Sequence, residues 1–278
     1  MFKKYWKFFV IFWSVVLVGI IGVFVFFWLI SAGKLGFMPT FEELENPNNR
    51  FASEVYFADG PIMNRYFEKE NRKYIEYREI PQSVIDALIA TEDVRFYDHS
   101  GVDVRGLFRV AKGLLTANTS AGGGSTISQQ LAKMLFPRES DLNVFELAIR
   151  KFREWVIAVR LEKSYTKEEI LTMYLNKYDF LNLAVGISSA ADIYFQVPLD
   201  SLKVEQAAML IGMAKNSSYY NPVRRPELTL NRRNVVLSQM YKYDKITREE
   251  CDSLKKLPLG LNFKRVDHKE GLATYFRE

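Results

Sequence analysis

The fold of this chain is decided by two stretches, TEDVRFYDHSGVD at residues 91–103 and GGSTISQQLAK at residues 123–133. Apolar residues at helical spacing precede the first stretch and place the carboxylate of Glu92 at their end. If that helix continues to Gly101, then Glu92, Phe96 and His99 share one helix face. An acidic side chain would then lie beside an aromatic wall.

The second stretch is a glycine turn that opens a helix. Its glycines give the backbone freedom before Ser125, a candidate N-cap, and the N–H groups at a helix start suit an anion. Thr126, Gln130 and Lys133 follow at helical spacing, so their polar ends line one stripe. A Walker-type phosphate loop is the alternative, but the Gly-Lys-Ser/Thr ending is missing. The pattern predicts a cradle for a diphosphate.

A third polar cluster, RKFRE, occupies residues 150–154. Arg150 and Glu154 are four residues apart, so a helix presents a cation and a carboxylate on one face. Taken alone, such a pair is typical of the surface of an amphipathic helix.

The N-terminal region predicts a membrane anchor. Residues 8–30 carry no charge and are long enough to cross a bilayer as a helix. Lys3, Lys4 and Lys7 precede them, which places the N-terminus in the cytoplasm and the rest of the chain outside. A cleaved signal peptide is the alternative, although its apolar region is normally shorter.

The remaining pattern predicts a mainly α domain. A strand followed by Asp59-Gly60 indicates a small β-hairpin. Helices are expected at 125–136, 141–162, 166–176, 186–195, 203–214 and 229–242. The expected organisation is a cytoplasmic tail (1–7), a transmembrane helix (8–30), a juxtamembrane linker (31–50), one catalytic domain (51–245) and the start of a connector to a further C-terminal domain (246–278).

These motifs resemble those of the peptidoglycan glycosyltransferase domain (glycosyltransferase family 51) of class A penicillin-binding proteins and monofunctional transglycosylases. The match covers most of residues 50–240, including GISSAADIYF at 186–195 and RRNVVL at 232–237. Two positions depart from the family pattern, which is rich in glycine where this chain has Phe180–Leu183 and has glycine in place of Gln196.

The resemblance implies a lysozyme-like, two-lobed domain that polymerises lipid II with inversion at the anomeric carbon and release of undecaprenyl diphosphate. It implies that Glu92 is the general base and that Glu154 assists departure of the donor, directly or through a divalent cation such as Mg or Mn. The remaining site residues implied are Asp93 as a support for Glu92, Phe96 as a wall, and Ser125, Thr126, Gln130, Lys133, Arg150 and Lys151 around the diphosphate.

The implied partners are lipid II, the growing lipid-linked glycan and the bacterial inner (cytoplasmic) membrane, with other cell-wall synthesis proteins as further candidates. The net charge of +5 suits anionic lipids and diphosphates, and no nucleic acid is expected at an exported domain. Three alternatives stay open: a catalytically silent membrane scaffold, a lysozyme-like glycan-cleaving enzyme, and a transpeptidase. The third lacks a Lys-Thr-Gly motif.

Overall fold

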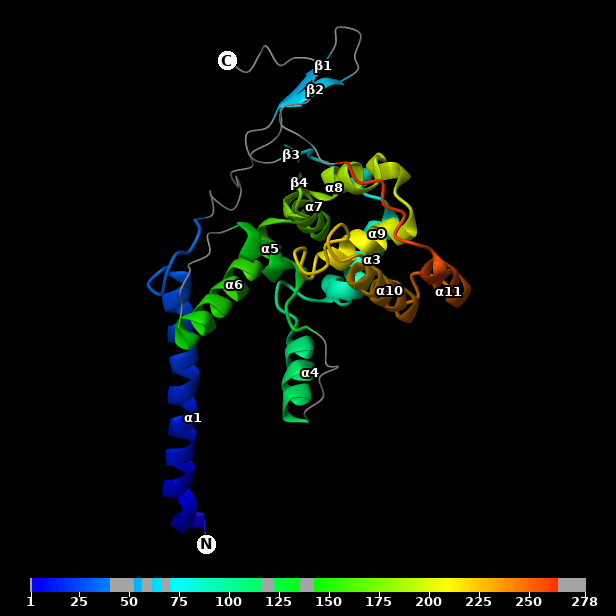
Figure 1. Cartoon of the computed structure of the whole chain (residues 1–278). Helices are drawn as coiled ribbons and strands as arrows, with labels where there is room; N and C mark the ends of the chain where they lie inside the picture. Colours follow the sequence, from blue (N-terminus) through cyan, green and yellow to red (C-terminus); the bar gives the residue numbers. More distant parts are fainter. Residues whose placement is uncertain are drawn as a thin grey trace.

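The computed structural model describes residues 2–40, 53–56, 62–66, 71–116, 123–135 and 143–264, which are mainly helical (Figure 1). The predicted mainly α class is therefore confirmed. The small hairpin is also present, because β1 (Ser53–Tyr56) pairs antiparallel with β2 (Ile62–Tyr66). The Asp-Gly turn expected there lies outside the described residues.

A second small ribbon joins distant parts of the chain. β3 (Asn71–Arg72) pairs in parallel with β4 (Ala184–Val185). Short 3₁₀ turns also occur at η1 (Tyr77–Glu79), η2 (Phe96–Asp98) and η4 (Leu199–Ser201). The helices beyond α1 are α3 (Gln82–Glu92), α4 (Val104–Leu115), α5 (Ile127–Leu135), α6 (Val144–Ser164), α7 (Lys167–Lys177), α8 (Ile187–Phe195), α9 (Val204–Met213), α10 (Pro226–Lys242) and α11 (Arg248–Lys256).

Helix α9 forms the centre of the larger group of helices. All of its residues from Ala207 to Met213 are buried. It packs against α3 and α10, and α8 and α11 also contact it. A segment that is apolar on every face belongs in a core, so residues 207–213 of α9 form the centre of this lobe.

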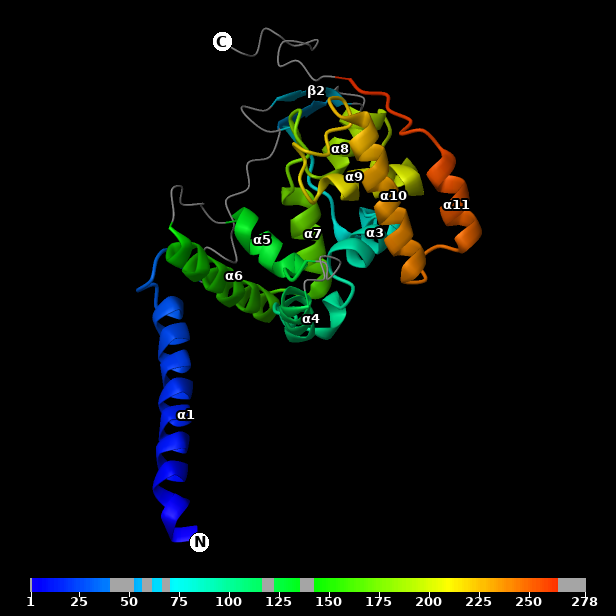
Figure 2. The ribbon, with the colours of Figure 1, turned by 60° about the horizontal axis from the view of Figure 1, so that its bottom comes forward.

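A smaller group of helices lies beside the first. Helix α5 packs against both α6 and α7 (Figure 2). Helix α7 also contacts α8 of the larger group. Thr166 caps α7 in a reciprocal capping box with Glu169, at the start of the helix expected over residues 166–176. This arrangement in two groups agrees with the expected two lobes.

The N-terminal helix α1 (Phe2–Ser31) docks on α6. Residues 5–31 form a helix long and apolar enough to cross a membrane. Near its end, the rings of Phe26 and Phe27 lie 5.4 and 5.7 Å from the ring of Phe152 on α6. Arg160, also on α6, donates a 2.8 Å hydrogen bond to the carbonyl oxygen of Ser31. The apolar helix is thus attached to the helix that carries the third polar cluster.

Helix α4 presents apolar side chains to solvent. Phe108 and Leu115 are 72% and 89% exposed, whereas Leu107 is half-buried. In both views α4 lies on the side of the body from which α1 extends (Figures 1 and 2). Phe108 and Leu115 therefore do not belong to the core.

The prediction that helix α3 continues from Glu92 to Gly101 is wrong. Helix α3 ends at Glu92, and Asp93 leaves the helical conformation at φ −156° and ψ 74°. The chain then forms the 3₁₀ turn η2, which includes Phe96. Glu92, Phe96 and His99 consequently do not share a helix face.

The two departures from the family's glycines coincide with unusual backbone. Leu181, Asn182 and Leu183 have φ values of 65°, 53° and 69°, and Gln196 has a φ of 55°. The left-handed region costs an ordinary L-residue roughly 1–2 kcal/mol. This chain thus keeps a conformation that suits glycine while using other side chains.

Candidate functional site

Glu92 lies on the wall of a cleft of about 440 Å³. The carboxylate comes from the last residue of α3, and its side chain is 14% exposed. Residues from α3, α4, the glycine turn, α5 and α10 line the cleft: Ala90, Thr91, Glu92, Val94, Arg109, Gly123, Ser125, Gln130, Lys215, Arg232, Val235, Gln239, Lys242 and Tyr243. Glu92 is the only acidic residue among these described lining residues.

Polar neighbours hold both oxygens of Glu92. Nε2 of Gln130 donates a 2.9 Å hydrogen bond to Oε2. Nη2 of Arg232 lies 3.4 Å from Oε1, and Arg232 also donates to the carbonyl oxygen of Gly212. Donors from two different helices, α5 and α10, therefore fix the orientation of the Glu92 carboxylate.

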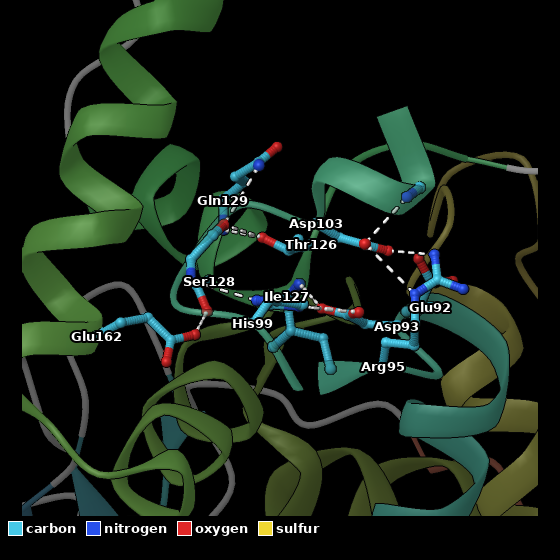
Figure 3. Close-up of polar contacts among 12 residues, drawn as sticks. Glu92, Asp93, Arg95, His99, Asp103, Thr126, Ile127, Ser128, Gln129 and Glu162 are labelled. Carbon is cyan, nitrogen blue, oxygen red and sulfur yellow. Dashed lines mark hydrogen bonds and ion pairs between the residues drawn. The ribbon is translucent and has the colours of Figure 1, made fainter. Parts of the chain in front are cut away.

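Asp93 joins the two sequence motifs. Its carboxylate accepts a 3.0 Å hydrogen bond from the backbone N–H of Ile127 and lies 2.9 Å from Nε2 of His99 (Figure 3). The Asp93 side chain is 4% exposed, so it lies beneath the cleft surface. Asp93 therefore fixes the start of α5 relative to Glu92, and its support of the chemistry stays a prediction.

Thr126 lies elsewhere than predicted. Its hydroxyl donates a 2.7 Å hydrogen bond to the carbonyl oxygen of Gly101 and accepts one from the backbone N–H of Gln129. Thr126 is 1% exposed and caps α5, the place the sequence suggested for Ser125. The expected donor to a diphosphate is thus a buried cap.

This capping also changes the expected anion site. The N–H groups of Ile127 and Gln129 are already bound by the side chains of Asp93 and Thr126 (Figure 3). The start of α5 is further fixed where Ser128 donates to the carboxylate of Glu162. Side chains of the protein therefore already bind two of the N–H groups that the sequence pattern assigns to a phosphate.

Phe96 is not a wall of the cleft. It is fully buried in the core and does not line the cavity. Nζ of Lys167 lies 4.3 Å from its ring centroid, a cation–π contact. The prediction for Phe96 fails because the helix ends at Glu92, four residues before it.

Lys151 connects the glycine turn to the second carboxylate. Its Nζ donates a 3.0 Å hydrogen bond to Oγ of Ser125 and lies 2.8 Å from Oε2 of Glu154. The predicted pair of Arg150 with Glu154 is replaced, within the described residues, by this i,i+3 pair. Lys151 remains 40% exposed and Glu154 only 12%, so the ammonium is the part that solvent or a ligand reaches.

The cleft contains cations that the sequence interpretation did not assign. They are Arg109, Lys215, Arg232 and Lys242. A signal for two of them existed, because Arg232, Val235, Gln239 and Lys242 recur at helical spacing on α10 and form one face. Lys215 follows α9 and carries no such signal. The predicted Lys133 is exposed on α5 and does not line this cleft.

Glu154 is the residue that the sequence suggests for contact with a divalent cation. No group of three or more His, Cys, Asp or Glu side chains in the described part of the chain is placed to hold an ion. The oxygen Oε2 of Glu154 already faces Lys151. Mg²⁺ is usually bound by one or two carboxylates together with substrate phosphates, so a contact of Glu154 with such an ion stays a prediction.

The transglycosylase family model matches residues 59–241 of this chain. Penicillin-binding protein 1A of Escherichia coli (strain K12) is 36% identical over 226 residues, which are 81% of this chain and 26% of that protein. The protein of the same name from Aquifex aeolicus (strain VF5) is 34% identical over 267 residues, 93% of this chain and 35% of that protein. This chain thus spans about a quarter to a third of the length of these relatives.

A solved structure is also similar. The crystal structure of Penicillin-Binding Protein 1A from Haemophilus influenzae matches 78% of this chain and 22% of that one, with 22% sequence identity and a TM-score of 0.44.

Proposed function

The chain belongs to the transglycosylase family, and from that premise we propose that it is a peptidoglycan glycosyltransferase that polymerises lipid II into glycan strands. The observation that carries this proposal is the cleft itself, where one carboxylate, Glu92, faces four cations. A diphosphate-bearing sugar substrate needs both a base and positive charge.

In the proposed reaction Glu92 is the general base. It takes the proton from the 4-hydroxyl of the acceptor sugar as that oxygen bonds to the anomeric carbon of the donor. The bond from that carbon to the diphosphate oxygen breaks on the opposite face, so the configuration inverts. Undecaprenyl diphosphate leaves with the electron pair. Gln130 and Arg232 support this role, because their hydrogen-bond donors orient the two oxygens of the carboxylate.

In this proposal two sets of cations bind two different substrates. Lys151 with Ser125, and Arg150 on the same helix, would bind the departing diphosphate, while Glu154 positions the ammonium of Lys151. Lys133, exposed on α5, would add to this set. The cleft cations Arg109, Lys215 and Lys242 would bind the anionic part of the second substrate. A divalent cation such as Mg or Mn would be bound mainly by the phosphate oxygens of the substrate.

We place the chain in the bacterial inner membrane with α1 as a single span and the catalytic domain outside the cytoplasm. The apolar length of α1 and the lysines before the span support this orientation. The exposed Phe108 and Leu115 of α4, on the side from which α1 extends, suit contact with lipid. A substrate with a prenyl tail would then meet the cleft at the membrane surface.

The proposal is tested with full-length protein in detergent, labelled lipid II and a matched pair of variants on α6. Wild type should form polymer. Lys151→Met should raise the KM for lipid II because the diphosphate loses a cation, whereas Lys163→Met, exposed near the end of the same helix, should not. Release of small fragments from preformed glycan, without polymer from lipid II, would instead identify a glycan-cleaving enzyme.

A further inference from the structure

We propose that Tyr174 is a positioning residue that orients the proposed base Glu92 through the side-chain amide of Gln130. This inference rests on the proposed function and adds a residue that lies outside the cleft. Tyr174 belongs to α7 and is 1% exposed. It does not line the cleft, so it can influence the reaction only through its neighbours.

The hydrogen bonds run in one direction from Tyr174 to Glu92. The Tyr174 hydroxyl donates a 3.0 Å bond to Oε1 of Gln130, and Nε2 of Gln130 donates a 2.9 Å bond to Glu92. An ionised carboxylate only accepts, so the amide must turn its NH₂ group toward Glu92. Its oxygen must then face Tyr174, and the phenol must be the donor.

The surroundings of Tyr174 keep the phenol in this role. Burial raises the pKa of Tyr174 well above its ordinary value, and the charge of Glu92 raises it further, so the hydroxyl stays protonated. The ring stacks on Tyr178 at 5.9 Å, and the hydroxyl of Tyr178 is bound to the carbonyl oxygen of Met213. The hydroxyl of Tyr174 therefore stays a donor, and the packing around the buried ring restricts its rotation.

Loss of the phenol hydroxyl should release the Gln130 amide. The amide oxygen then has lost its donor, so the side chain of Gln130 moves more freely and its hydrogen bond to Glu92 breaks more often. While that bond is broken, the carboxylate is held less firmly, by Arg232, whose nitrogen is 3.4 Å away. The base would remain in the cleft, but its oxygen would no longer be fixed toward the acceptor hydroxyl.

A matched pair of variants, Tyr174→Phe and Tyr194→Phe, tests this role. Both tyrosines are buried and both hydroxyls are hydrogen-bonded, but Tyr194 donates to the carbonyl oxygen of Phe180 and has no contact with Gln130. Each variant loses one oxygen atom and keeps the ring. A purely structural role predicts similar behaviour of the two.

The first measurement needs no turnover. In full-length, ¹⁵N-glutamine-labelled protein in micelles, the side-chain amide signal of Gln130 is assigned by its loss in Gln130→Met. Tyr174→Phe should speed hydrogen exchange of that amide about five- to tenfold, as expected for a lost hydrogen bond, and Tyr194→Phe should not. Equal exchange rates in wild type and Tyr174→Phe would overturn the proposal.

The second measurement is the pH–rate profile of lipid II polymerisation. Tyr174→Phe should lower kcat about tenfold, leave KM within about twofold, and move the acid limb of the profile to higher pH. Tyr194→Phe should keep the limb of wild type, and an unmoved limb in Tyr174→Phe would overturn the proposal. An inactive wild type would refute the proposed function, and the exchange rates would still decide the role of Tyr174.

Discussion

The carboxylate of Asp93 accepts a 3.0 Å hydrogen bond from the backbone N–H of Ile127, thirty-four positions along the chain. The residue that follows the proposed base thereby caps the helix that carries Gln130. Because Gln130 in turn donates to Glu92, the two motifs hold each other in a closed arrangement of hydrogen bonds. The fold thereby brings two distant stretches of sequence together in one candidate site.

Asp93→Ala should destabilise the fold and also lower activity. The substitution leaves the buried N–H of Ile127 without an acceptor, which costs about 1–3 kcal/mol. Thermal unfolding and lipid II polymerisation of the variant measure both effects. Asp98→Ala, an exposed position in η2, is the control and should match wild type in both. An Asp93→Ala protein as stable as wild type would contradict the capping role.

The ion pair of Asp103 with Arg95 should make stability depend on pH. Burial alone would raise the pKa of Asp103, but hydrogen bonds from Arg95 and from the backbone N–H of Gly106 outweigh it and leave the pKa lowered. A lowered folded pKa stabilises the fold above the unfolded pKa, and this stabilisation is lost as pH falls through the folded value.

The difference in Tm between wild type and Asp103→Asn should therefore shrink as pH falls from about 6 to about 3, across the range in which an aspartate titrates. Thermal unfolding at several pH values measures this difference. Asp98→Asn, at an exposed position, should show no such trend. A Tm difference for Asp103→Asn that stays constant with pH would show that the charge of Asp103 is not involved.

Gln196→Gly should stabilise the protein. Gln196 is exposed and left-handed at the end of α8, where glycine carries no steric cost. The expected gain is about 1 kcal/mol, less the loss of its side-chain hydrogen bond to Asp192. The matched control is Gln82→Gly in the first turn of α3, which should lower Tm. If both substitutions lower Tm by the same amount, backbone strain at Gln196 is not significant.

The exposed apolar side chains of α4 should matter only in a bilayer. Phe108→Ser with Leu115→Ser should slow polymerisation in vesicles and leave the rate in detergent close to wild type, because the cleft is unchanged. Leu257→Ser, at an exposed apolar residue after α11, is the control. Equal losses in vesicles and detergent would indicate a structural role for Phe108 and Leu115.

Much of the fold could be predicted because local patterns determine it. The capping box of Thr166 with Glu169 sets the start of α7, and the uncharged run after Lys7 sets α1. The end of α3 could not be predicted in this way. The residues after Glu92 continue a helical pattern, but Asp93 leaves the helix and its carboxylate caps the distant helix α5. Local sequence does not show that contact.

The candidate site, too, could be predicted only in part from the sequence. The position of Glu92 near the end of a helix could be predicted from the apolar spacing before it, whereas Gln130, predicted as a donor to a diphosphate, donates to Glu92. The sequence predicts that Thr126 binds a ligand, yet its hydroxyl donates to the carbonyl oxygen of Gly101, a partner that only the tertiary structure reveals. Lys215 joins the cleft through the packing of α9, which local spacing does not encode.

The central claim is that Glu92 is the general base of a lipid II polymerase, and the substitution Glu92→Gln tests it most directly. Glutamine keeps the shape of the side chain but cannot accept the proton, so polymerisation should fall at least about a hundredfold. The measurement is the rate of polymer formation from labelled lipid II by wild type and Glu92→Gln, with thermal unfolding as proof of folding. Near-normal polymerisation by a folded Glu92→Gln protein would contradict the account.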